Sequence, residues 1–400
     1  MKILFVIPSL AKGGQEKAGM ILTNYLRQFH DVTVVCFEEK NCADFNYESD
    51  IVRILPSWRY GLIKKPVSGF QKIIKLKKLK RTLNPDVSIA FGNSAIILNW
   101  LADCGDKKIS AIRQSFTGII NNKSASLKLH KSLYVRALKK SQKIIPVSSS
   151  INTELKEYFN IPNDIFINNG YNIEEINKSA AEDIPSFKND RLWLIHSGRF
   201  DICKGHWHLI KIFAEIKKTF PEAGLILLGS VDESDSGGAS ILNYCKKYAE
   251  KNHLRWSAGE NNFEADIIFA GHQKAPFKFI KRSHLFLLTS LWEGFPNALV
   301  EAMACGIPVA AADCPTGPKE ILVNNETGEE YGLLLPPLDG SFNNFSFLTD
   351  ATDLFWAEKI RDLLEDKVKI ESYKKQSAKR ASHYSVEKMG NKWLKVIEEL

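Results

Sequence analysis

Short apolar runs recur along the chain and alternate with longer stretches whose apolar residues stand at helical spacing. Short apolar runs between turn residues are typical of buried strands. A first series of runs lies at residues 2–7, 32–37, 51–55, 87–91, 108–112 and 144–147, and a second lies at 192–197, 225–228, 266–269, 285–288 and 309–312. Strands that alternate with helices predict parallel sheets, and two series predict two doubly wound α/β domains.

A polar and acidic stretch separates the two series and predicts a domain boundary. Residues 176–190 contain Pro185 and few large apolar side chains, which is typical of a linker. Because 400 residues exceed what one hydrophobic core usually serves, we expect domains at 1–175 and 191–380. A last helix at 381–400 carries Met389, Trp393 and Ile397 at helical spacing. We expect this helix to cross back toward the first domain.

The composition is that of an ordinary globular protein, with 44% hydrophobic and 25% charged residues. No apolar run reaches the roughly 18 residues of a transmembrane helix. The first residues, Met1 to Pro8, form an apolar run with one charge, which we interpret as a strand and not a leader. The seven cysteines include no Cys-x-x-Cys pair, which favours reduced thiols over a disulfide framework or a zinc site. These features predict a cytoplasmic protein.

Positive charge is concentrated in one part of the chain. Residues 51–150 hold 20 Lys and Arg against 3 Asp and Glu, a net +17 within a total of +8, so the remainder carries −9. Two stretches here, 64–83 and 127–143, interleave lysines with apolar residues, as do cationic amphipathic helices that lie on anionic membranes. Ordinary helices with solvated lysine faces are the alternative. A nucleic-acid partner is not expected, because no recognised binding motif accompanies the charge.

Two candidate ligand loops each follow an expected strand. Gly13 and Gly14 follow the first strand, where glycine allows a close backbone approach to a ligand. The G-x-G-x-x-G fingerprint of nicotinamide-binding proteins is absent. Arg199 and Lys204 follow the first strand of the second series, and paired cations can neutralise a nucleoside diphosphate leaving group. Taken alone, each loop is more simply explained as a turn or as surface cations.

The most informative string lies at residues 290–306. Pro296 and Gly306 mark the first turn and the end of a short helix. Glu293 lies in the loop before this helix, and Glu301 lies within it. The loop amides and the helix N-terminus form an anion site, with two carboxylates available for neighbouring hydroxyl groups. That arrangement suits a sugar nucleotide.

This string closely resembles the Glu-(seven residues)-Glu signature of retaining glycosyltransferases of family 4. The segments 269–280, 313–322 and 330–336 also resemble the family, and the likeness extends over nearly the whole chain. It implies the GT-B fold, in which two Rossmann-like domains face each other across a cleft. It also implies transfer of a sugar from a nucleotide donor, UDP-linked, with retention at the anomeric carbon. The family needs no metal or other cofactor, and no Asp-x-Asp is present to hold a metal.

The resemblance implies roles for individual residues. Arg199 and Lys204, with the helix N-terminus, would stabilise the departing diphosphate. Glu293 would hold hydroxyls of the donor sugar, and Glu301 would hold the ribose. The remaining positions expected around the donor are Gly13, Gly14, Gly271, Gly294, Phe295, Asn297, Ala298 and Leu299.

Two residues of the first domain are expected at the cleft, as contacts to the acceptor or to the donor sugar. Asn93 follows the strand at 87–91, where a plain turn residue is the simpler explanation, and Arg113 follows the strand at 108–112. Many family members have a histidine near the place of Arg113. Because this chain has an arginine there, the resemblance does not specify which residue of the first domain contacts the donor sugar.

The sequence therefore predicts a retaining, metal-independent hexosyl- or N-acetylhexosaminyltransferase. The acceptor is expected to be a lipid-linked or polysaccharide precursor of a bacterial surface glycan such as O-antigen, capsule or lipopolysaccharide. We expect the protein in the cytoplasm, bound peripherally to the inner face of the cytoplasmic membrane. A GT-B sugar-nucleotide epimerase and a non-catalytic sugar-binding protein are the alternatives, and acceptor-dependent transfer would separate them from a transferase.

Overall fold

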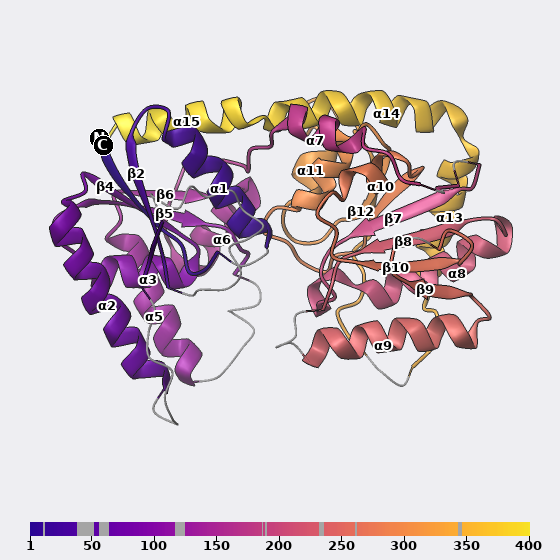
Figure 1. Ribbon diagram of the computed structural model, residues 1–400, viewed down its shortest axis with the longest axis horizontal. Helices are drawn as coiled ribbons and strands as arrows, with labels where there is room; N and C mark the ends of the chain where they lie inside the picture. The colour runs from indigo at the N-terminus through magenta and orange to yellow at the C-terminus, as the bar shows by residue number, and fades with distance from the viewer. Residues whose placement is uncertain are drawn as a thin grey trace. The chain divides into compact units, whose positions relative to one another are not determined.

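The computed structural model describes residues 1–10, 13–37, 52–55, 64–116, 125–185, 187–188, 190–231, 236–260, 262–342 and 346–400. The chain forms two compact units (Figure 1), and each is an α/β layer structure. Unit 1 comprises Met1–Tyr171 and Tyr384–Leu400, and unit 2 comprises Asn172–His383. The strands of both sheets pair in parallel, which confirms the predicted pair of Rossmann-like domains.

Unit 1 contains a six-stranded sheet with the order β3-β2-β1-β4-β5-β6. Its strands are β1 (Lys2–Val6), β2 (Asp31–Cys36), β3 (Val52–Ile54), β4 (Val87–Phe91), β5 (Lys107–Ile112) and β6 (Lys143–Pro146). Its helices are α1 (Gly14–Leu26), α2 (Lys64–Leu83), α3 (Asn93–Leu101), α5 (Ala125–Lys139), α6 (Ser149–Phe159) and α15 (Val386–Glu398).

The last helix, α15, is far from most of unit 1 in sequence but belongs to its core. Met389, Trp393 and Ile397 of α15 are buried in the same apolar cluster as residues of β1, β2 and α1. The helices approach closely because residue 390 is glycine: a Cβ there would lie 2.1 Å from the Tyr25 ring. Helices α2 and α5 pack against α3 (Figure 1).

Unit 2 contains a seven-stranded sheet with the order β13-β12-β11-β7-β8-β10-β9. Its strands are β7 (Trp193–Ser197), β8 (Gly224–Leu228), β9 (Trp256–Ala258), β10 (Ile267–Gly271), β11 (Leu285–Leu288), β12 (Val309–Ala312) and β13 (Leu333–Leu335). Its helices are α7 (Ile173–Ala180), α8 (His206–Thr219), α9 (Ser236–Lys251), α10 (Phe277–Lys281), α11 (Asn297–Ala304), α12 (Pro318–Leu322), α13 (Ala351–Glu365) and α14 (Lys367–Ala381); short 3₁₀ turns lie at Ile202–Lys204 and Ser382–Tyr384.

The structure differs from the sequence prediction at the domain boundary. Residues 176–190 are not a linker, because helix α7 begins at Ile173 and packs against α10 and α11 within unit 2. Ile176 and Ile184 are buried there. The stretch looked like a linker because its apolar residues are few, yet those few are enough to anchor a short helix. The edge strands β9 and β13 were also not predicted, since each has three residues.

One residue of the expected cationic surface helix is internal. Lys80 of α2 is 1% exposed, and its ammonium donates to Asp106 Oδ2 at 2.7 Å. A membrane-binding face and a solvated face, the two interpretations of residues 64–83, both place Lys80 at the surface, whereas the structure buries it. Spacing alone does not show that a carboxylate lies in the core to pair with it. Within the described residues, no helix combines the length and apolar character that a bilayer crossing needs.

Candidate functional site

The sheet of unit 2 reverses its strand order between β7 and β11, since β8 lies on the other side of β7. In open parallel sheets, ligands bind at the carboxyl ends of the strands at such a reversal, because the two loops there diverge and leave a crevice. The loop after β7 carries Arg199 and Lys204, and the loop after β11 carries Glu293. The topology therefore brings together two loops that the sequence had singled out separately.

An ion pair joins the two loops at this edge of the sheet. Lys204 Nζ lies 2.6 Å from Glu293 Oε1, and Ser290 Oγ donates to the same oxygen at 2.7 Å. The side chains of Lys204 and Glu293 are 23% and 10% exposed, respectively. Burial acts to lower the pKa of the Lys204 ammonium, but the charge of Glu293 outweighs it and the pKa is raised. Lys204 is therefore a cation at neutral pH, in a partly dehydrated place where its charge acts strongly.

Backbone contacts hold the two loops in register. Thr289 Oγ1 donates to the Lys204 carbonyl at 3.0 Å, and the Leu291 amide donates to the Cys203 carbonyl at 2.8 Å. Gly205 has φ +59, and a Cβ there would lie 2.3 Å from the Thr289 carbonyl oxygen. Only glycine fits this position, because both the conformation and the space exclude a side chain.

Residues at the ends of the neighbouring strands β8 and β10 lie next to these two loops. Gly229, after β8, has φ +141, and a Cβ there would lie 2.0 Å from the Gly198 carbonyl oxygen. Its amide donates to the Gly271 carbonyl at 2.8 Å. Gly271 ends β10 with φ +70, and a Cβ on it would meet no atom within 4 Å, so its backbone is open on that side. Arg199 is exposed on the loop after β7.

Helix α11 carries the rest of the predicted donor residues in two different ways. The side chains of Phe295 and Leu299 are buried, so these residues can meet a ligand only through their backbone. The Leu299 amide already donates to the Pro296 carbonyl at 3.0 Å. Gly294, Asn297 and Ala298 are partly exposed, and Glu301 is 9% exposed.

Three residues that support the site were missed by sequence reasoning. Ser290 bonds Glu293, as described above, and Thr316 Oγ1 donates to the Glu293 carbonyl. Gly317 has φ +97, and a Cβ there would lie 2.5 Å from Pro296. The signal for Thr316 and Gly317 was their place soon after β12, the strand next to β11.

The remaining predicted residues lie in unit 1, at the carboxyl ends of its own strands. Gly13 precedes α1 with extended backbone, and Gly14 is the first residue of that helix. Asn93 is the first residue of α3, and Arg113 follows β5 and is buried. The predicted site is therefore divided between the two units.

Comparison with known proteins identifies the family. Residues 12–175 match the family model described as Glycosyltransferase Family 4, and residues 177–337 match the model described as Glycosyl transferases group 1. The chain belongs to glycosyltransferase family 4. Together the two models cover most of both units and include all the loops described above, so the chain is a glycosyltransferase.

Several relatives align with this family 4 chain over most of its length. It is 27% identical to an uncharacterised glycosyltransferase of Methanocaldococcus jannaschii, over 88% of this chain and 93% of that protein. It is 24% identical to the N-acetylgalactosamine-N,N'-diacetylbacillosaminyl-diphospho-undecaprenol 4-alpha-N-acetylgalactosaminyltransferase of Campylobacter jejuni, over 99% of both. Anabaena HepE, solved with UDP-glucose, has a TM-score of 0.76 at 18% identity over 100% of both chains, and this likeness shows the GT-B fold alone.

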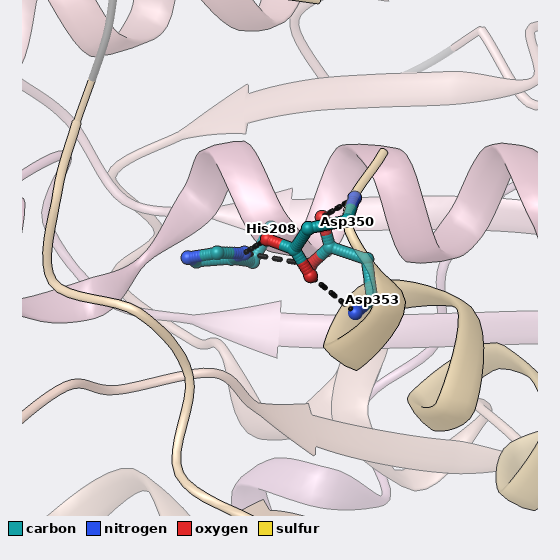
Figure 2. A group of neighbouring side chains, drawn as sticks. All are labelled: His208, Asp350 and Asp353. Carbon is teal, nitrogen blue, oxygen red and sulfur yellow. Dashed lines mark hydrogen bonds and ion pairs between the residues drawn. The ribbon is translucent and has the colours of Figure 1, made fainter. Parts of the chain in front are cut away.

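A second cluster of polar side chains in this glycosyltransferase is structural. Figure 2 shows His208 of α8 facing Asp350 and Asp353 at the start of α13. His208 Nδ1 lies 2.6 Å from Asp353 Oδ1, and Nε2 lies 2.8 Å from the Asp339 carbonyl. Each ring nitrogen of His208 already lies at hydrogen-bond distance from an oxygen of the protein, so both positions at which the ring could bind a metal are occupied. Asp350 and Asp353 form a capping box, so the cluster fixes the N-terminus of α13 on α8.

Proposed function

We propose that this glycosyltransferase moves a hexose or N-acetylhexosamine from UDP to an acceptor carried on a lipid diphosphate, with retention at the anomeric carbon. The observation that carries the proposal is the Lys204–Glu293 pair at the β7/β11 crevice, beside the N-terminus of α11. A cation and a helix N-terminus suit a diphosphate, and an adjacent carboxylate suits sugar hydroxyls. The Campylobacter jejuni relative, named for a diphospho-undecaprenol acceptor, supports the acceptor class.

The mechanism follows from where charge develops. The bond between the anomeric carbon and the diphosphate oxygen breaks, and the diphosphate leaves with growing negative charge. Lys204, Arg199 and the α11 N-terminus stabilise that charge. Glu293 accepts hydrogen bonds from the sugar hydroxyls and fixes the sugar. The acceptor hydroxyl attacks from the side of the leaving group, and a diphosphate oxygen takes its proton, so the configuration is retained.

The proposed reaction requires no metal or other cofactor. Mg²⁺ in other nucleotide-dependent enzymes neutralises phosphate charge, and here Lys204 and Arg199 supply positive charge from the protein. Glu301, lower on α11, is assigned to the ribose hydroxyls, since a nearly buried carboxylate accepts hydrogen bonds without contacting the reacting atoms.

The direct test is a panel of nucleotide sugars with a lipid-diphosphate-linked acceptor. Release of UDP and formation of an extended, α-retained product are expected with one UDP-sugar only when acceptor is present. A change of the donor sugar without acceptor would instead identify an epimerase. Turnover that depends on added divalent metal and ceases with EDTA would contradict metal-independent transfer.

The two glutamates should separate nucleotide binding from transfer. Glu301→Ala is expected to weaken UDP binding by about tenfold, because a charge-assisted hydrogen bond to the ribose is lost. Glu293→Ala should leave UDP binding intact or strengthen it, since Lys204 loses its internal partner, while transfer falls. Calorimetry with UDP alone measures both. Weaker UDP binding in Glu293→Ala and unchanged binding in Glu301→Ala would reverse the assignment.

We also propose that unit 1 binds the inner face of an anionic membrane through α2 and α5, as a peripheral protein of the cytoplasm. Three large apolar side chains project from these helices: Phe70 and Ile74 on α2, which are 65% and 51% exposed, and Leu129 on α5, which is 65% exposed. Lys78 and Arg81 are exposed on α2 as well. Exposed apolar residues within a cationic face are typical of helices that insert among lipid headgroups.

Charge reversal tests the membrane proposal. Each Lys or Arg near an anionic surface contributes about 1 kcal/mol, and salt screens it. Changing Lys72, Lys75, Lys78 and Arg81 to Glu is therefore expected to release the protein from anionic vesicles at low salt, in a sedimentation assay. Transfer to a short, water-soluble acceptor should survive, because none of the four changes is at a residue assigned to the donor, and Arg199, Lys204 and Glu293 lie in unit 2.

A matched control keeps the same charge change elsewhere. Four exposed lysines of α14 in unit 2, changed to Glu, should leave vesicle binding unaltered: Lys367, Lys369, Lys375 and Lys379. If the wild-type protein ignores anionic vesicles at low salt, the cationic face is simply solvated and the membrane proposal is wrong.

A further inference from the structure

Unit 1 has a strand-order reversal of its own, between β1 and β4, with β2 on the other side of β1. The loops after these strands abut: Gln15 Nε2, in the first turn of α1, donates to the Phe91 carbonyl at 3.4 Å. Gly92 has φ +99, and a Cβ there would lie 2.6 Å from Gln15 Nε2. Ligands of open parallel sheets bind at the carboxyl ends of the strands where the strand order reverses, so the carboxyl ends of β1 and β4 are expected to bind a ligand.

Arg113, directly after β5, presents an unsatisfied cation at this edge. The residue is 8% exposed, and its guanidinium lies over the Phe91 ring at 4.5 Å. Nη2 donates to Asn169 Oδ1, whereas Nη1 is buried without a hydrogen-bond partner among the residues that the structure describes. In the part of the chain that the structure describes, no carboxylate forms an ion pair with Arg113.

A buried guanidinium without an anion is costly, and a structural arginine would ordinarily be paired. Burial lowers the pKa of Arg113 to about 9, against a smaller opposing influence of Tyr171. The side chain is still charged at neutral pH. The planar guanidinium can donate two parallel hydrogen bonds to two oxygens of one phosphate or carboxylate, which a lysine ammonium cannot do.

A second buried polar atom, Asn93 Oδ1, lies just after the neighbouring strand β4, as Arg113 lies just after β5. Phe91 pairs with Ala111 in the β4–β5 ladder, so Asn93 and Arg113 each stand two residues beyond that pair. Asn93 Oδ1 is buried, and no described residue forms a hydrogen bond with it. Asn93 is also the first residue of α3, so the amide end of a nine-residue helix faces the same edge.

We propose that Arg113 binds a phosphate oxyanion of the acceptor, at the crevice formed by the loops after β1, β4 and β5. The α3 N-terminus offers amides to the same oxyanion, and Asn93 Oδ1, which only accepts hydrogen bonds, faces a donor group of the acceptor such as a sugar hydroxyl. The proposal rests on the proposed function, which supplies an acceptor on a lipid diphosphate. The acceptor is favoured over the donor as the source of the phosphate, because Lys204 and Arg199 of unit 2 already serve the donor diphosphate.

The probe for the experiment is inorganic pyrophosphate, titrated calorimetrically into the full chain with and without saturating UDP. With UDP present, the wild-type protein should still bind pyrophosphate. Arg113→Gln should weaken this binding at least tenfold, and Arg136→Gln, at an exposed position on α5, should not change it. UDP binding itself should be the same in all three proteins.

A second variant keeps the experiment informative even if Arg113→Gln folds poorly. Asn169→Asp has nearly the same shape and places a carboxylate beside Arg113 Nη2, so the guanidinium gains an internal partner. The thermal midpoint should stay level or rise, while pyrophosphate binding is lost and the KM for the lipid-diphosphate acceptor rises at least tenfold. An arginine with a purely structural role would give the same stability but unchanged pyrophosphate binding.

Two outcomes overturn the inference. Pyrophosphate binding that survives both Arg113→Gln and Asn169→Asp shows that the anion lies elsewhere. Weakened UDP binding in Arg113→Gln shows that the arginine holds the donor phosphate. If the wild-type protein fails to bind UDP, only the proposed donor site is contradicted. The pyrophosphate titrations without UDP, compared between the wild-type protein and the Arg113→Gln variant, still test whether Arg113 binds the anion.

Discussion

Lys204→Ala is expected to lower kcat about a hundredfold with the native donor. Removing one preorganised charge at a leaving group costs on the order of 3 kcal/mol of transition-state stabilisation. The loop should keep its shape, because Thr289 and Leu291 bond the backbone of residues 204 and 203 and not the lysine side chain. The loss should therefore fall on kcat, and the thermal midpoint should fall somewhat as well, because Glu293, whose side chain is 10% exposed, loses its cationic partner. Steady-state release of UDP in the presence of acceptor measures it.

Comparison variants make this prediction specific. Arg199→Ala should also slow turnover, and Lys218→Ala, at an exposed position on α8, should match the wild-type rate. Glu293→Ala combined with Lys204→Ala should be no slower than the slower single variant if the two side chains act as one unit. Near-wild-type kcat in both Lys204→Ala and Arg199→Ala would rule out the assignment of these cations to the diphosphate.

Asp106→Ala is expected to lower the free energy of unfolding by about 3–5 kcal/mol, the usual cost of leaving one member of a buried ion pair alone. Asp106 accepts from Lys80 Nζ at 2.7 Å and from Ser88 Oγ, and Lys108 Nζ lies 3.8 Å from its other oxygen. The side chains of Lys80 and Asp106 are 0% and 1% exposed. Urea unfolding at about pH 7 measures the loss, and Lys78→Ala on the exposed face of α2 is the control.

The pH dependence of that loss has a definite sign. Burial lowers the pKa of Lys80, and Asp106 opposes the shift, so removing Asp106 lowers the pKa further. Between that pKa and the unfolded value, near 10.5, the unfolded chain binds more protons than the native one. Stability of Asp106→Ala should then rise with pH, and its deficit should be smaller at about pH 9 than at about pH 7.

A charge-free pair distinguishes the ion pair from simple packing. Lys80→Met with Asp106→Asn keeps an acceptor for Ser88 and removes both charges of the pair, while Lys108 keeps Asp103 as its partner. This double variant should be more stable than Asp106→Ala alone, because similar-sized neutral groups replace a buried pair at little cost. A double variant as unstable as the single one would show that lost packing, and not an unpaired ammonium, causes the effect.

The pattern of apolar residues was sufficient to predict the strands that form the middle of each sheet. Runs such as 87–91 and 285–288 are buried along their whole length, so they are dominated by apolar residues and stand out. The edge strand β13, Leu333–Leu335, and helix α7 were missed, because short elements at an edge carry too few apolar positions to produce a period.

The sequence predicted the site residues that lie close together on one loop and the helix after it. Glu293, Pro296 and Glu301 lie within a single strand-loop-helix unit, so their spacing along the chain fixes their spacing in space. Arg199 and Lys204 were found for the same reason. Thr316, which donates to the Glu293 carbonyl, follows another strand, β12, and its place after that strand pointed to the site only once the strand order was known.

By itself, then, the sequence of this glycosyltransferase determined its two α/β series and the residue types that follow each strand, because periodicity and loop chemistry are local properties. Only the tertiary structure decided which of those residues meet. The strand order placed Lys204 against Glu293, 89 residues apart, buried Lys80 on Asp106, and left Arg113 without an anion. Charge pairing inside a protein depends on which strands become neighbours, and that is settled by packing across the whole sheet.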